Sequence, residues 1–386
     1  MAQRVDVFGT ADLGGALASA VEALDAGRGV LLPTETLYGI AARIDEPSGA
    51  ELLRRLRRKA DNPFTPHVPD AQHAMRFLGD LSDIGERAMR KLWPGPVSII
   101  FDVPAGRRAE VAGETGIAEE DLYNAAGQIT LRCPDNLLAI ELLASAGGPC
   151  GVGLPPGGPF YEVPDDALLD DLGGDVALAF DAGPTRFTKP STTIRVIGDG
   201  YEVVRPGVYD RRIIDRALMT NVLFVCSGNT CRSPMAEALA RRAIADALQV
   251  EPERIDTAGF SVASAGTFAM HGVPATPAAV TAVQDMGGDL SSHRSRPLSV
   301  ELVHEADVVI TMGRSHAEQV MGLVPASVDK VLTLDPEGDI EDPIGSDEAH
   351  YRKLAQRMRE LIQSRLDETV LRDLDKGGNT GNGRND

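Results

Sequence analysis

The stretch NVLFVCSGNTCRSPMAEALARRAI, residues 221–244, decides the fold of the C-terminal half of the chain. It opens with the continuous apolar run 222–225, which is typical of a strand buried on both faces of a parallel sheet. Pro234 and the residues after it indicate the first turns of a helix. Between strand and helix lies a short loop that places Cys226 and Arg232 in the spacing Cys-x5-Arg. The sequence therefore predicts a strand, a tight loop and a helix in succession.

The predicted loop has the chemistry of an anion site. Successive backbone N–H groups in such a loop converge on one point, where the helix dipole adds positive potential. That potential favours the thiolate form of Cys226, which is the form that attacks phosphorus. Arg232 offers a planar fork that matches two phosphoryl oxygens. We therefore expect a cysteine-dependent phosphomonoesterase with Cys226 as its nucleophile and Arg232 as its phosphate-binding side chain.

The remaining loop residues have supporting roles. The hydroxyl of Ser233 can donate a hydrogen bond to the thiolate or to the departing sulfur. Gly228 lets the backbone turn closely around the anion, and Asn229 can hold the loop through side-chain hydrogen bonds. The residues expected to form the phosphate site around the nucleophile are Ser227, Gly228, Asn229, Thr230, Cys231 and Ser233.

A thiolate nucleophile also needs a proton donor for the leaving group. Asp342 precedes Pro343, and a long amphipathic helix follows. Because Pro343 disfavours helix at the preceding residue, it fixes a loop that presents the carboxyl group. We expect Asp342 to protonate the leaving group and then to activate water against the phosphocysteine.

These residues, together with the segments AGF, HRSRPL, ADVVITM and EDPIG, resemble the low-molecular-weight protein-tyrosine-phosphatase family over almost the whole C-terminal domain. The resemblance implies a four-stranded parallel sheet flanked by helices, with no metal and no cofactor for the phosphatase. It implies the same roles for Cys226, Arg232 and Asp342. It also implies that Cys231 can trap an oxidised Cys226 as a reversible disulfide. The alternative is that Cys231 has no redox role and is only a small buried residue.

Within that family, the chain resembles the protein-arginine phosphatases more closely. These carry threonine at the position of Thr230, where tyrosine phosphatases usually carry an aliphatic residue. A hydroxyl there suits the guanidinium side of phosphoarginine and can orient a water. The loop after Asp342 reads Pro343, Ile344, Gly345 and lacks the tyrosines that flank a phosphotyrosine ring. Phosphoarginine is the expected substrate, with phosphotyrosine or another phosphoester as alternatives in which Thr230 only fills the loop.

The N-terminal part has a different pattern. Residues 1–208 are rich in Gly and Pro, and short apolar runs at 29–32, 97–101, 129–131 and 176–180 predict strands of an α/β domain. The segments GVLLPTETLYGIAA, WPGPVSIIF, ITLRCP, KPSTTIRV and VVRPGVY resemble the threonylcarbamoyl-AMP synthase family, which joins threonine, bicarbonate and ATP for tRNA modification on a twisted α/β fold. The pocket residues that this resemblance implies are Thr34, Thr36, Tyr38, Lys59, Ser191, Thr192 and Arg205.

Two positions depart from the synthase pattern. The family's Lys-x-Arg signature falls at Lys59, Ala60 and Asp61, so that an acid replaces a phosphate-binding cation. The Ser-x-Asn segment falls near residues 151–154, where the chain reads GVGL. We therefore expect a noncatalytic, synthase-like binding module. The alternative is a bifunctional enzyme that also forms L-threonylcarbamoyladenylate, and only this alternative needs ATP and magnesium.

Charge and composition restrict the partners. The net charge of -19 argues against nonspecific binding of nucleic acid, which needs a basic surface. The basic residues at 54, 55 and 57–59 are expected to form a solvated helix face, although they leave weak tRNA or RNA binding by the N-terminal domain open. No apolar run approaches the roughly 20 residues of a membrane span. Phosphorylated proteins are thus the expected partners, with no membrane.

The domain plan follows from these segments. We expect a synthase-like domain at 1–208, a charged helical linker at 209–220, the phosphatase at 221–372 and a disordered tail at 373–386. The start of the chain lacks the long apolar stretch of a secretory signal. Four cysteines in a chain of this length suit a reducing cytoplasm. A binding protein with a vestigial phosphatase is disfavoured, because Cys226, Arg232 and Asp342 are all present.

Overall fold

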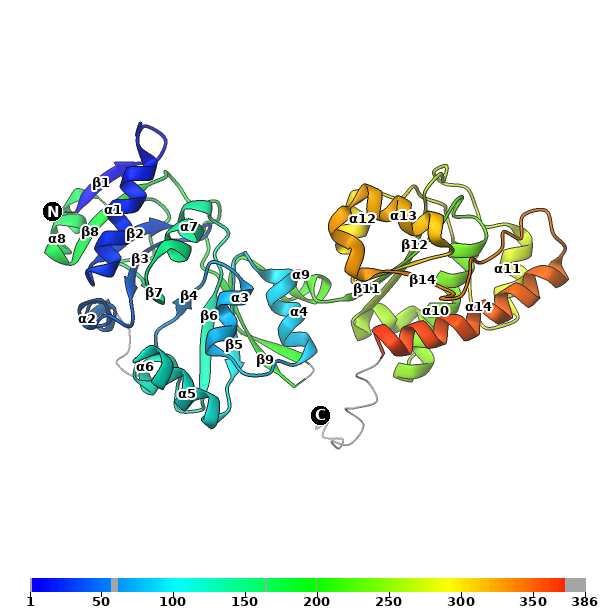
Figure 1. Cartoon of the computed structure of the whole chain (residues 1–386), viewed down its shortest axis with the longest axis horizontal. Helices are drawn as coiled ribbons and strands as arrows, with labels where there is room; N and C mark the ends of the chain where they lie inside the picture. Colours follow the sequence, from blue (N-terminus) through cyan, green and yellow to red (C-terminus); the bar gives the residue numbers. More distant parts are fainter. Residues whose placement is uncertain (1, 57–61, 164, 199, 372–386) are drawn as a thin grey trace. The chain divides into compact units, whose positions relative to one another are not determined.

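The computed structural model describes residues 2–56, 62–163, 165–198 and 200–371. The chain forms two compact units, Met1–Leu218 and Met219–Asp386 (Figure 1). Lys59 and the tail expected at 373–386 lie outside the described residues. The second unit carries the Cys-x5-Arg loop.

The second unit is built on a four-stranded sheet in the order β12-β11-β13-β14, in which every neighbouring pair is parallel. Its strands are β11 Thr220–Cys226, β12 Phe260–Gly266, β13 Val308–Thr311 and β14 Val331–Thr333. The predicted apolar run lies in β11, between β12 and β13. Val222 and Phe224 join the core on one face of the sheet, whereas Leu223 and Val225 join the core on the other. This alternation explains why the run is apolar at every position.

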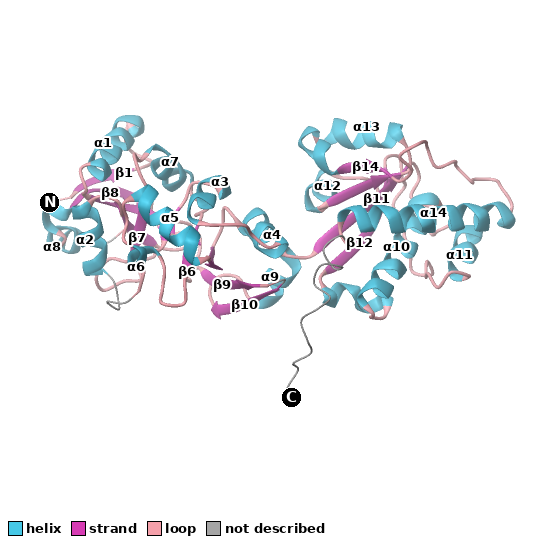
Figure 2. Ribbon diagram, turned by 60° about the horizontal axis from the view of Figure 1, so that its bottom comes forward, coloured by secondary structure: helices cyan, strands magenta, loops and turns pink. Residues whose placement is uncertain are grey.

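Helices cover both faces of this sheet (Figure 2). Buried residues of α10, α11 and α14 share one core with β11, and residues of α12 and α13 share the other. The helices of the unit are α10 Arg232–Leu248, η3 Pro252–Ala258, α11 Pro277–Gln284, α12 Val300–Glu305, α13 Arg314–Leu323, η4 Pro325–Lys330 and α14 Glu348–Thr369. The predicted four-stranded parallel sheet flanked by helices is confirmed.

The first unit holds a ten-stranded mixed sheet in the order β1-β8-β2-β3-β7-β4-β6-β5-β9-β10. Its strands are β1 Gln3–Asp6, β2 Gly29–Pro33, β3 Tyr38–Arg43, β4 Pro66–His67, β5 Val97–Asp102, β6 Gln128–Arg132, β7 Cys150–Gly153, β8 Val176–Asp181, β9 Thr192–Ile197 and β10 Gly200–Arg205. The four apolar runs predicted as strands are β2, β5, β6 and β8. The expected α/β class is therefore confirmed for this unit as well.

Helices of the first unit pack against its sheet and bury their apolar residues there. They are α1 Leu13–Asp25, α2 Pro47–Leu56, α3 Ala71–Ala74, η1 Met75–Phe77, α4 Asp83–Leu92, α5 Ala105–Thr115, α6 Glu119–Leu122, α7 Leu137–Ser145, α8 Asp166–Asp171, η2 Gly173–Asp175 and α9 Arg211–Ala217. Among the described residues, no helix combines the length and the apolar character needed to cross a membrane.

The stretch 209–220, expected as a linker, is largely folded. Helix α9 occupies its centre, and Asp210 caps the helix by accepting a hydrogen bond from the backbone N–H of Ile213. Ile214 and Leu218 are buried in the core of the first unit. Thr220 already belongs to β11. The chain therefore passes from the last core residue of one unit to the first strand of the other within two residues.

Candidate active site

Cys226 ends β11, and its side chain is enclosed by the loop that follows. The Sγ atom lies 3.0 Å from Ser233 Oγ and accepts a hydrogen bond from the backbone N–H of Asn229 at 3.2 Å. Helix α10 begins at Arg232, with Cys231 as its N-cap residue. The sulfur therefore faces a backbone donor and a hydroxyl close to the N-terminus of a helix, where negative charge is stabilised.

Asn229 holds the loop in shape. Its backbone has φ 53°, a left-handed conformation that asparagine tolerates better than most residues. Its Nδ2 atom donates to Ser233 Oγ at 3.0 Å and to Ser264 Oγ at 2.8 Å, and its Oδ1 atom accepts from the backbone N–H of Arg296 at 2.9 Å. His293 Nε2 lies 2.9 Å from the Asn229 carbonyl oxygen. Because Asn229 Nδ2 donates to Ser233 Oγ, the proton of that hydroxyl points to one of two acceptors, Cys226 Sγ at 3.0 Å or the carbonyl oxygen of Ala265 at 3.3 Å.

Strand β12 supports the loop from the side. Ser264 extends the hydrogen-bond network from Asn229 to Glu237, because its hydroxyl donates to Glu237 Oε2 at 2.6 Å. Gly266 allows the closest approach: a Cβ atom there would lie 2.5 Å from the carbonyl oxygen of Ser227 and 2.9 Å from the backbone nitrogen of Asn229. Our sequence reasoning missed Ser264, Glu237 and Gly266, since nothing near them in the sequence marks their contact with the loop.

Arg232 and Asp342 meet in the structure. Arg232 Nη2 donates to Asp342 Oδ2 at 2.5 Å, and Nη1 donates to the carbonyl oxygen of Ile340 at 3.0 Å. Arg232 is buried, whereas the Asp342 side chain is 46% exposed. The fold thus brings together the two expected side chains from positions 110 residues apart. The carboxyl group remains accessible to a substrate.

Thr230 and Cys231 follow Cys226 in the sequence and contact a second group of residues. The backbone N–H of Thr276 donates to the Thr230 carbonyl oxygen at 2.9 Å. The Tyr351 hydroxyl donates to Cys231 Sγ at 3.4 Å, and burial raises the pKa of Tyr351. Both loop cysteines, Cys226 and Cys231, are free thiols.

The loops around the site carry exposed apolar side chains. Ile344, two residues after Asp342, is 70% exposed. Phe268, on the loop after β12, is 78% exposed, and its backbone N–H donates to the Ser227 carbonyl oxygen at 2.9 Å. The sequence showed that residues 343–345 contain no tyrosine, but our prediction did not include the aromatic ring of Phe268 near the loop. Its signal is weak, because a lone phenylalanine ordinarily indicates core.

In the first unit, two of the expected pocket residues share a buried cluster with a pair of charges. Arg132 Nη2 donates to Glu35 Oε1 at 2.8 Å and to Thr36 Oγ1 at 2.6 Å. Thr34 Oγ1 lies 3.1 Å from Thr36 Oγ1 and donates to the carbonyl oxygen of Leu37. Arg132 Nε is buried without a hydrogen-bond partner among the described residues. The sequence did not single out Glu35 or Arg132.

Other expected pocket residues are engaged in local hydrogen bonds. The Tyr38 hydroxyl donates to the carbonyl oxygen of Gly183 and accepts from the backbone N–H of Ala182. Thr192 Oγ1 both donates to and accepts from the backbone of Tyr209. These bonds give Tyr38 and Thr192 a role in holding the fold.

Ser191 and Arg205 form a pair of their own. Arg205 Nη2 donates to Ser191 Oγ and to its carbonyl oxygen, both at 3.0 Å. Ser98 Oγ lies 3.1 Å from Ser191 Oγ, and Ser98 is opposite Arg132 in the register of β5 and β6. Side chains of directly opposed residues point to the same face of a sheet. Ser191, Ser98 and Arg132 are thereby placed along neighbouring strands.

The GVGL segment is packed against α2. A Cβ atom at Gly151 would lie 2.9 Å from Ile44 Cγ2 and 3.0 Å from Leu53 Cδ1, and one at Gly153 would lie 3.1 Å from Leu56 Cβ. Side chains at these two positions would therefore require Ile44, Leu53 or Leu56 to move by a few tenths of an ångström. The residues present do not fit the nucleotide-binding role of that segment.

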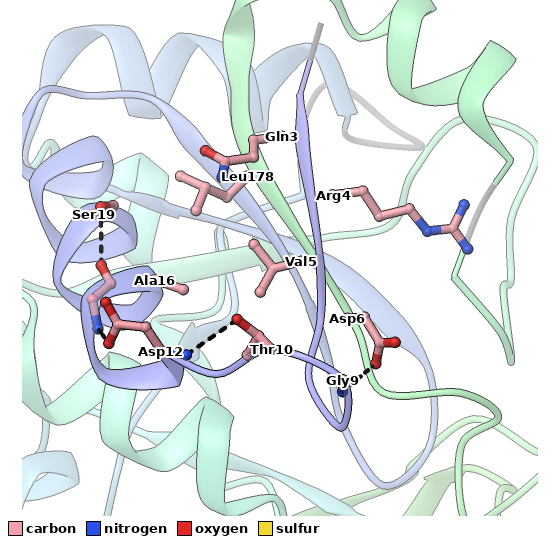
Figure 3. A pocket seen from close by; sticks show the side chains of 11 residues that line it. Gln3, Arg4, Val5, Asp6, Gly9, Thr10, Asp12, Ala16, Ser19 and Leu178 are labelled. Atoms are coloured by element: carbon pink, nitrogen blue, oxygen red, sulfur yellow. Dashed lines mark hydrogen bonds between the residues drawn. The ribbon is translucent and has the colours of Figure 1, made fainter.

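A separate hollow lies on the first unit between β1 and α1 (Figure 3). Both of its carboxylates accept local backbone hydrogen bonds. Asp6 accepts from the N–H of Gly9 at 3.0 Å, and Asp12, the N-cap residue of α1, accepts from that of Gly15 at 2.8 Å. The hollow contains none of the expected site residues. Among the described residues, no group of three or more His, Cys, Asp or Glu side chains is arranged to hold a metal ion.

The basic stretch predicted as a solvated helix face is partly paired with acids. Arg54 Nη2 lies 2.6 Å from Asp121 Oδ2, and Arg55 Nη2 lies 2.7 Å from Asp175 Oδ2. Residues 57–59 lie outside the described part of the chain. These two pairs partly neutralise Arg54 and Arg55.

A parallel sheet whose central strand ends in a cysteine at the entrance of an anion loop is the arrangement expected for a cysteine-based phosphatase. The comparisons agree: the family described as low molecular weight phosphotyrosine protein phosphatase matches residues 221–376. A probable low molecular weight protein-tyrosine-phosphatase, EpsP, of Ralstonia solanacearum is 34% identical over 160 residues, which cover 40% of this chain and 97% of the relative. A protein-arginine-phosphatase of Bacillus subtilis is 36% identical over 148 residues, covering 37% of this chain and 92% of the relative.

A second family matches the first unit. The Sua5, YciO and YrdC family, described as telomere recombination, matches residues 22–207. A putative threonylcarbamoyl-AMP synthase of Mycobacterium tuberculosis is 32% identical over 199 residues, covering 50% of this chain and 83% of the relative. The chain belongs to the low molecular weight phosphotyrosine protein phosphatase family through its C-terminal part and to the Sua5, YciO and YrdC family through its N-terminal part. It is a protein phosphatase of the tyrosine or arginine type.

Proposed function

We propose that the second unit hydrolyses phosphoarginine in proteins and that Cys226, Arg232 and Asp342 carry the reaction. The observations that support this most directly are that the thiol lies beside a helix N-terminus and that Arg232, the first residue of that helix, is bonded through Nη2 to Asp342. The Bacillus subtilis relative is a protein-arginine-phosphatase. Phosphorylated proteins are accordingly the proposed partners.

In the first step, the phosphoryl group of the substrate takes the place of Asp342 on the Arg232 guanidinium. Two N–H groups of Arg232 then bind two phosphoryl oxygens. The Cys226 thiolate attacks phosphorus, the P–N bond breaks, and its electron pair goes to the guanidine nitrogen. Asp342 donates a proton to that nitrogen. The products of this step are a free arginine side chain and a phosphocysteine.

In the second step, water attacks the phosphocysteine. The Asp342 carboxylate, which has given up its proton, accepts one from the water. The S–P bond breaks, inorganic phosphate leaves, and the electron pair returns to sulfur. Ser233 stabilises the departing thiolate, because its hydroxyl lies 3.0 Å from Cys226 Sγ. No metal or cofactor enters this sequence of steps.

The preference for phosphoarginine rests on the rim of the loop. Thr230 presents a hydroxyl on a half-buried side chain, which is suited to hydrogen bonding at the guanidinium side of the substrate. Ile344 replaces an aromatic ring beside Asp342 and leaves room for a flexible alkyl chain. Phe268 adds one exposed ring, which is compatible with packing along either an alkyl chain or a phenyl ring. The rim therefore favours phosphoarginine through Thr230.

The test is the specificity constant kcat/KM on two peptides that differ only in carrying phosphoarginine or phosphotyrosine, at one pH and one concentration of the full-length chain. A clear preference for phosphoarginine supports the proposal. A preference for phosphotyrosine would make Thr230 incidental. The Cys226→Ser variant serves as the control for contaminating phosphatase and should lose turnover almost entirely.

For the first unit, we propose a noncatalytic, synthase-like module. Asp61 stands where the family has a phosphate-binding cation, and Gly151 and Gly153 are packed against α2. ATP and magnesium would be needed only if the unit were an active synthase, and nucleic acid would be a partner only in that tRNA pathway or through weak RNA binding. The free thiols of all four cysteines support a cytoplasmic location.

Pyrophosphate release tests this second proposal. The full-length chain is incubated with ATP, magnesium, threonine and bicarbonate, and pyrophosphate is measured against a heat-inactivated sample. We expect no release above that control. Release that depends on threonine would overturn the proposal and establish the bifunctional alternative.

A further inference from the structure

His316 is a buried histidine that the mechanism above does not use. It lies in the first turn of α13 and is 6% exposed. Its Nε2 atom is 2.9 Å from the hydroxyl oxygen of Ser227, the residue that follows the nucleophile. Helix α13 thus contacts the phosphate loop through the His316–Ser227 pair.

The Ser227 hydroxyl links His316 to the phosphate-binding arginine. Arg232 Nη2 lies 3.5 Å from Ser227 Oγ. A guanidinium nitrogen only donates, so the hydroxyl oxygen must accept from Arg232, and its own proton is then free for His316 Nε2. This order of donors requires an imidazole with no proton on Nε2, which is the neutral form with its proton on Nδ1.

The surroundings of His316 favour the neutral form. The charged groups that act on it are Arg232 of α10 and the carboxylates Asp339 and Asp342 of the segment after β14. Burial, followed by the positive charge of Arg232, lowers the pKa of His316, and the two carboxylates oppose this change without reversing it. His316 Nδ1 is buried and has no hydrogen-bond partner among the described residues. Protonation at Nε2 would turn this nitrogen into a donor to Ser227 Oγ, so the Ser227 proton would lose its acceptor and the direction of the bond would reverse.

We propose that neutral His316 is a positioning residue for the phosphatase reaction: it accepts the Ser227 proton and so keeps the Ser227 oxygen turned towards Arg232. When phosphate displaces Asp342, the guanidinium loses one partner at Nη2 and retains Ser227. The retained bond to Ser227 then keeps the Arg232 guanidinium oriented so that its two N–H groups can bind two phosphoryl oxygens. The inference rests on the proposed function of the same loop and adds a residue from α13 to it.

The first experiment measures phosphate affinity independently of turnover. Binding of inorganic phosphate to the full-length chain is followed by calorimetry for the wild type, His316→Phe and His316→Gln. Phenylalanine keeps a ring without an acceptor, whereas the amide oxygen of glutamine can accept the Ser227 proton. We expect His316→Phe to weaken phosphate binding about 3- to 10-fold, the equivalent of one hydrogen bond, and His316→Gln to restore most of it. Equal affinity in the wild type and His316→Phe would overturn the inference.

A double-mutant cycle tests whether His316 acts through Ser227. Ser227→Ala alone should weaken phosphate binding by a similar factor, and His316→Phe should add little in the Ser227→Ala background. Additive effects would mean that His316 acts by another route and would overturn the inference. If His316→Phe does not fold, the same cycle is run with His316→Leu, which also lacks an acceptor, and a loss in the double variant clearly greater than in Ser227→Ala overturns the coupling.

The kinetic readout separates this inference from the proposed function. In phosphopeptide hydrolysis, His316→Phe should raise KM by the same factor while kcat changes less, and the wild-type KM should rise as acidification protonates His316. His316→Gln should lack that acid-side rise in KM. Hydrolysis by the wild type with an unchanged KM in His316→Phe overturns the inference alone. Absence of hydrolysis in the wild type, with phosphate affinity still dependent on His316, overturns the proposed function alone.

Discussion

Asp342 is the residue whose replacement separates chemistry from binding. Its side chain is about half exposed and accepts from Arg232 and from the backbone N–H of Ile344, and the amide oxygen of asparagine can accept in the same place, so Asp342→Asn should fold normally. Asparagine cannot transfer the proton, and we expect kcat on a phosphoarginine peptide to fall on the order of 10²–10⁴-fold. Steady-state kinetics on the full-length chain give the measurement.

The matched control is Glu341→Gln. Glu341 is the adjacent carboxylate, and it pairs with His350 Nε2 at 2.9 Å instead of with Arg232. Its neutralisation changes the local charge by the same amount and should alter kcat only slightly. If both variants lose the same activity, the effect of Asp342 is a general field effect, and the acid lies elsewhere.

Thr230 is the residue on which we propose that substrate choice depends. In Thr230→Ile the hydroxyl is replaced by an aliphatic group of the kind usual in tyrosine phosphatases. We expect the ratio of kcat/KM for phosphoarginine to that for phosphotyrosine to fall about 10-fold, roughly the value of one hydrogen bond to a charged group. Thr230→Ser, which keeps the hydroxyl, should preserve the ratio. An unchanged ratio in Thr230→Ile would remove Thr230 from the specificity argument.

Among the elements, β11 and α10 were predictable because their signals are local. A strand buried on both faces must be apolar at each successive position, and residues 222–225 satisfy this requirement within four residues. The loop after them begins at a cysteine, ends at an arginine and contains a glycine, and this combination seldom has another explanation than an anion site. The sequence thus indicated where Cys226 and Arg232 lie, and the resemblance added the fold around them.

The rest of the site comes from elements far away in sequence. Ser264 ends up beside Asn229 because β12 pairs with β11 in parallel register, and His316 reaches Ser227 because α13 follows β13 at the same edge of the sheet. Neither residue carries a local pattern that distinguishes it from an ordinary serine or histidine. Strand order and register decide these contacts, and a single sequence does not encode them in any short segment.

The buried histidine of β4 gives a test of the first unit. Burial, and to a lesser degree the charge of Arg132, lowers the pKa of His67 to about 3. The unfolded chain binds a proton near pH 6.5, so unfolding takes up a proton below that pH. The stability contributed by neutral His67 is therefore complete above pH 6.5 and is lost as the pH falls towards 3. Between pH 7 and 5.5 this amounts to about 1–2 kcal/mol of unfolding free energy.

Trp93 makes this change measurable, because it is the only tryptophan of the chain and is buried in the core of the first unit. Urea unfolding followed by its fluorescence should show a lower unfolding free energy at pH 5.5 than at pH 7. His67→Gln should reduce that difference, whereas His73→Gln, at an exposed histidine, should leave it unchanged. The same pH dependence in wild type and His67→Gln would contradict the assignment.

The molecule as a whole combines two families whose motifs are unequally preserved. In the second unit, the residues proposed as nucleophile, phosphate-binding arginine and acid are all present, and Arg232 is bonded to Asp342. In the first unit, Glu35 and Arg132 form a buried pair while the expected nucleotide segment is filled by α2. The contrast was visible in the sequence as intact and altered motifs, but the packing that fills Gly151 required the structure.

The net charge of -19 makes a prediction about the whole chain. A protein with a large net negative charge repels an acidic phosphopeptide at long range. We expect Arg232 and the helix N-terminus to attract the phosphoryl group of that peptide locally. Salt shortens the Debye length from about 30 Å at 0.01 M to about 8 Å at 0.15 M, which screens the distant repulsion more than the buried contacts. For an acidic phosphoarginine peptide, kcat/KM should therefore rise severalfold over this range.

The matched control is a peptide of the same length in which lysines flank the phosphoarginine. Its association is not opposed by the field of the chain, so its kcat/KM should stay level or fall as salt is added. A salt of a bulky, weakly binding anion avoids competition at the phosphate loop, and binding of inorganic phosphate at each ionic strength reports any such competition. If kcat/KM of the acidic peptide falls with salt instead, the local positive potential around Arg232 extends far enough to outweigh the charge of the whole molecule.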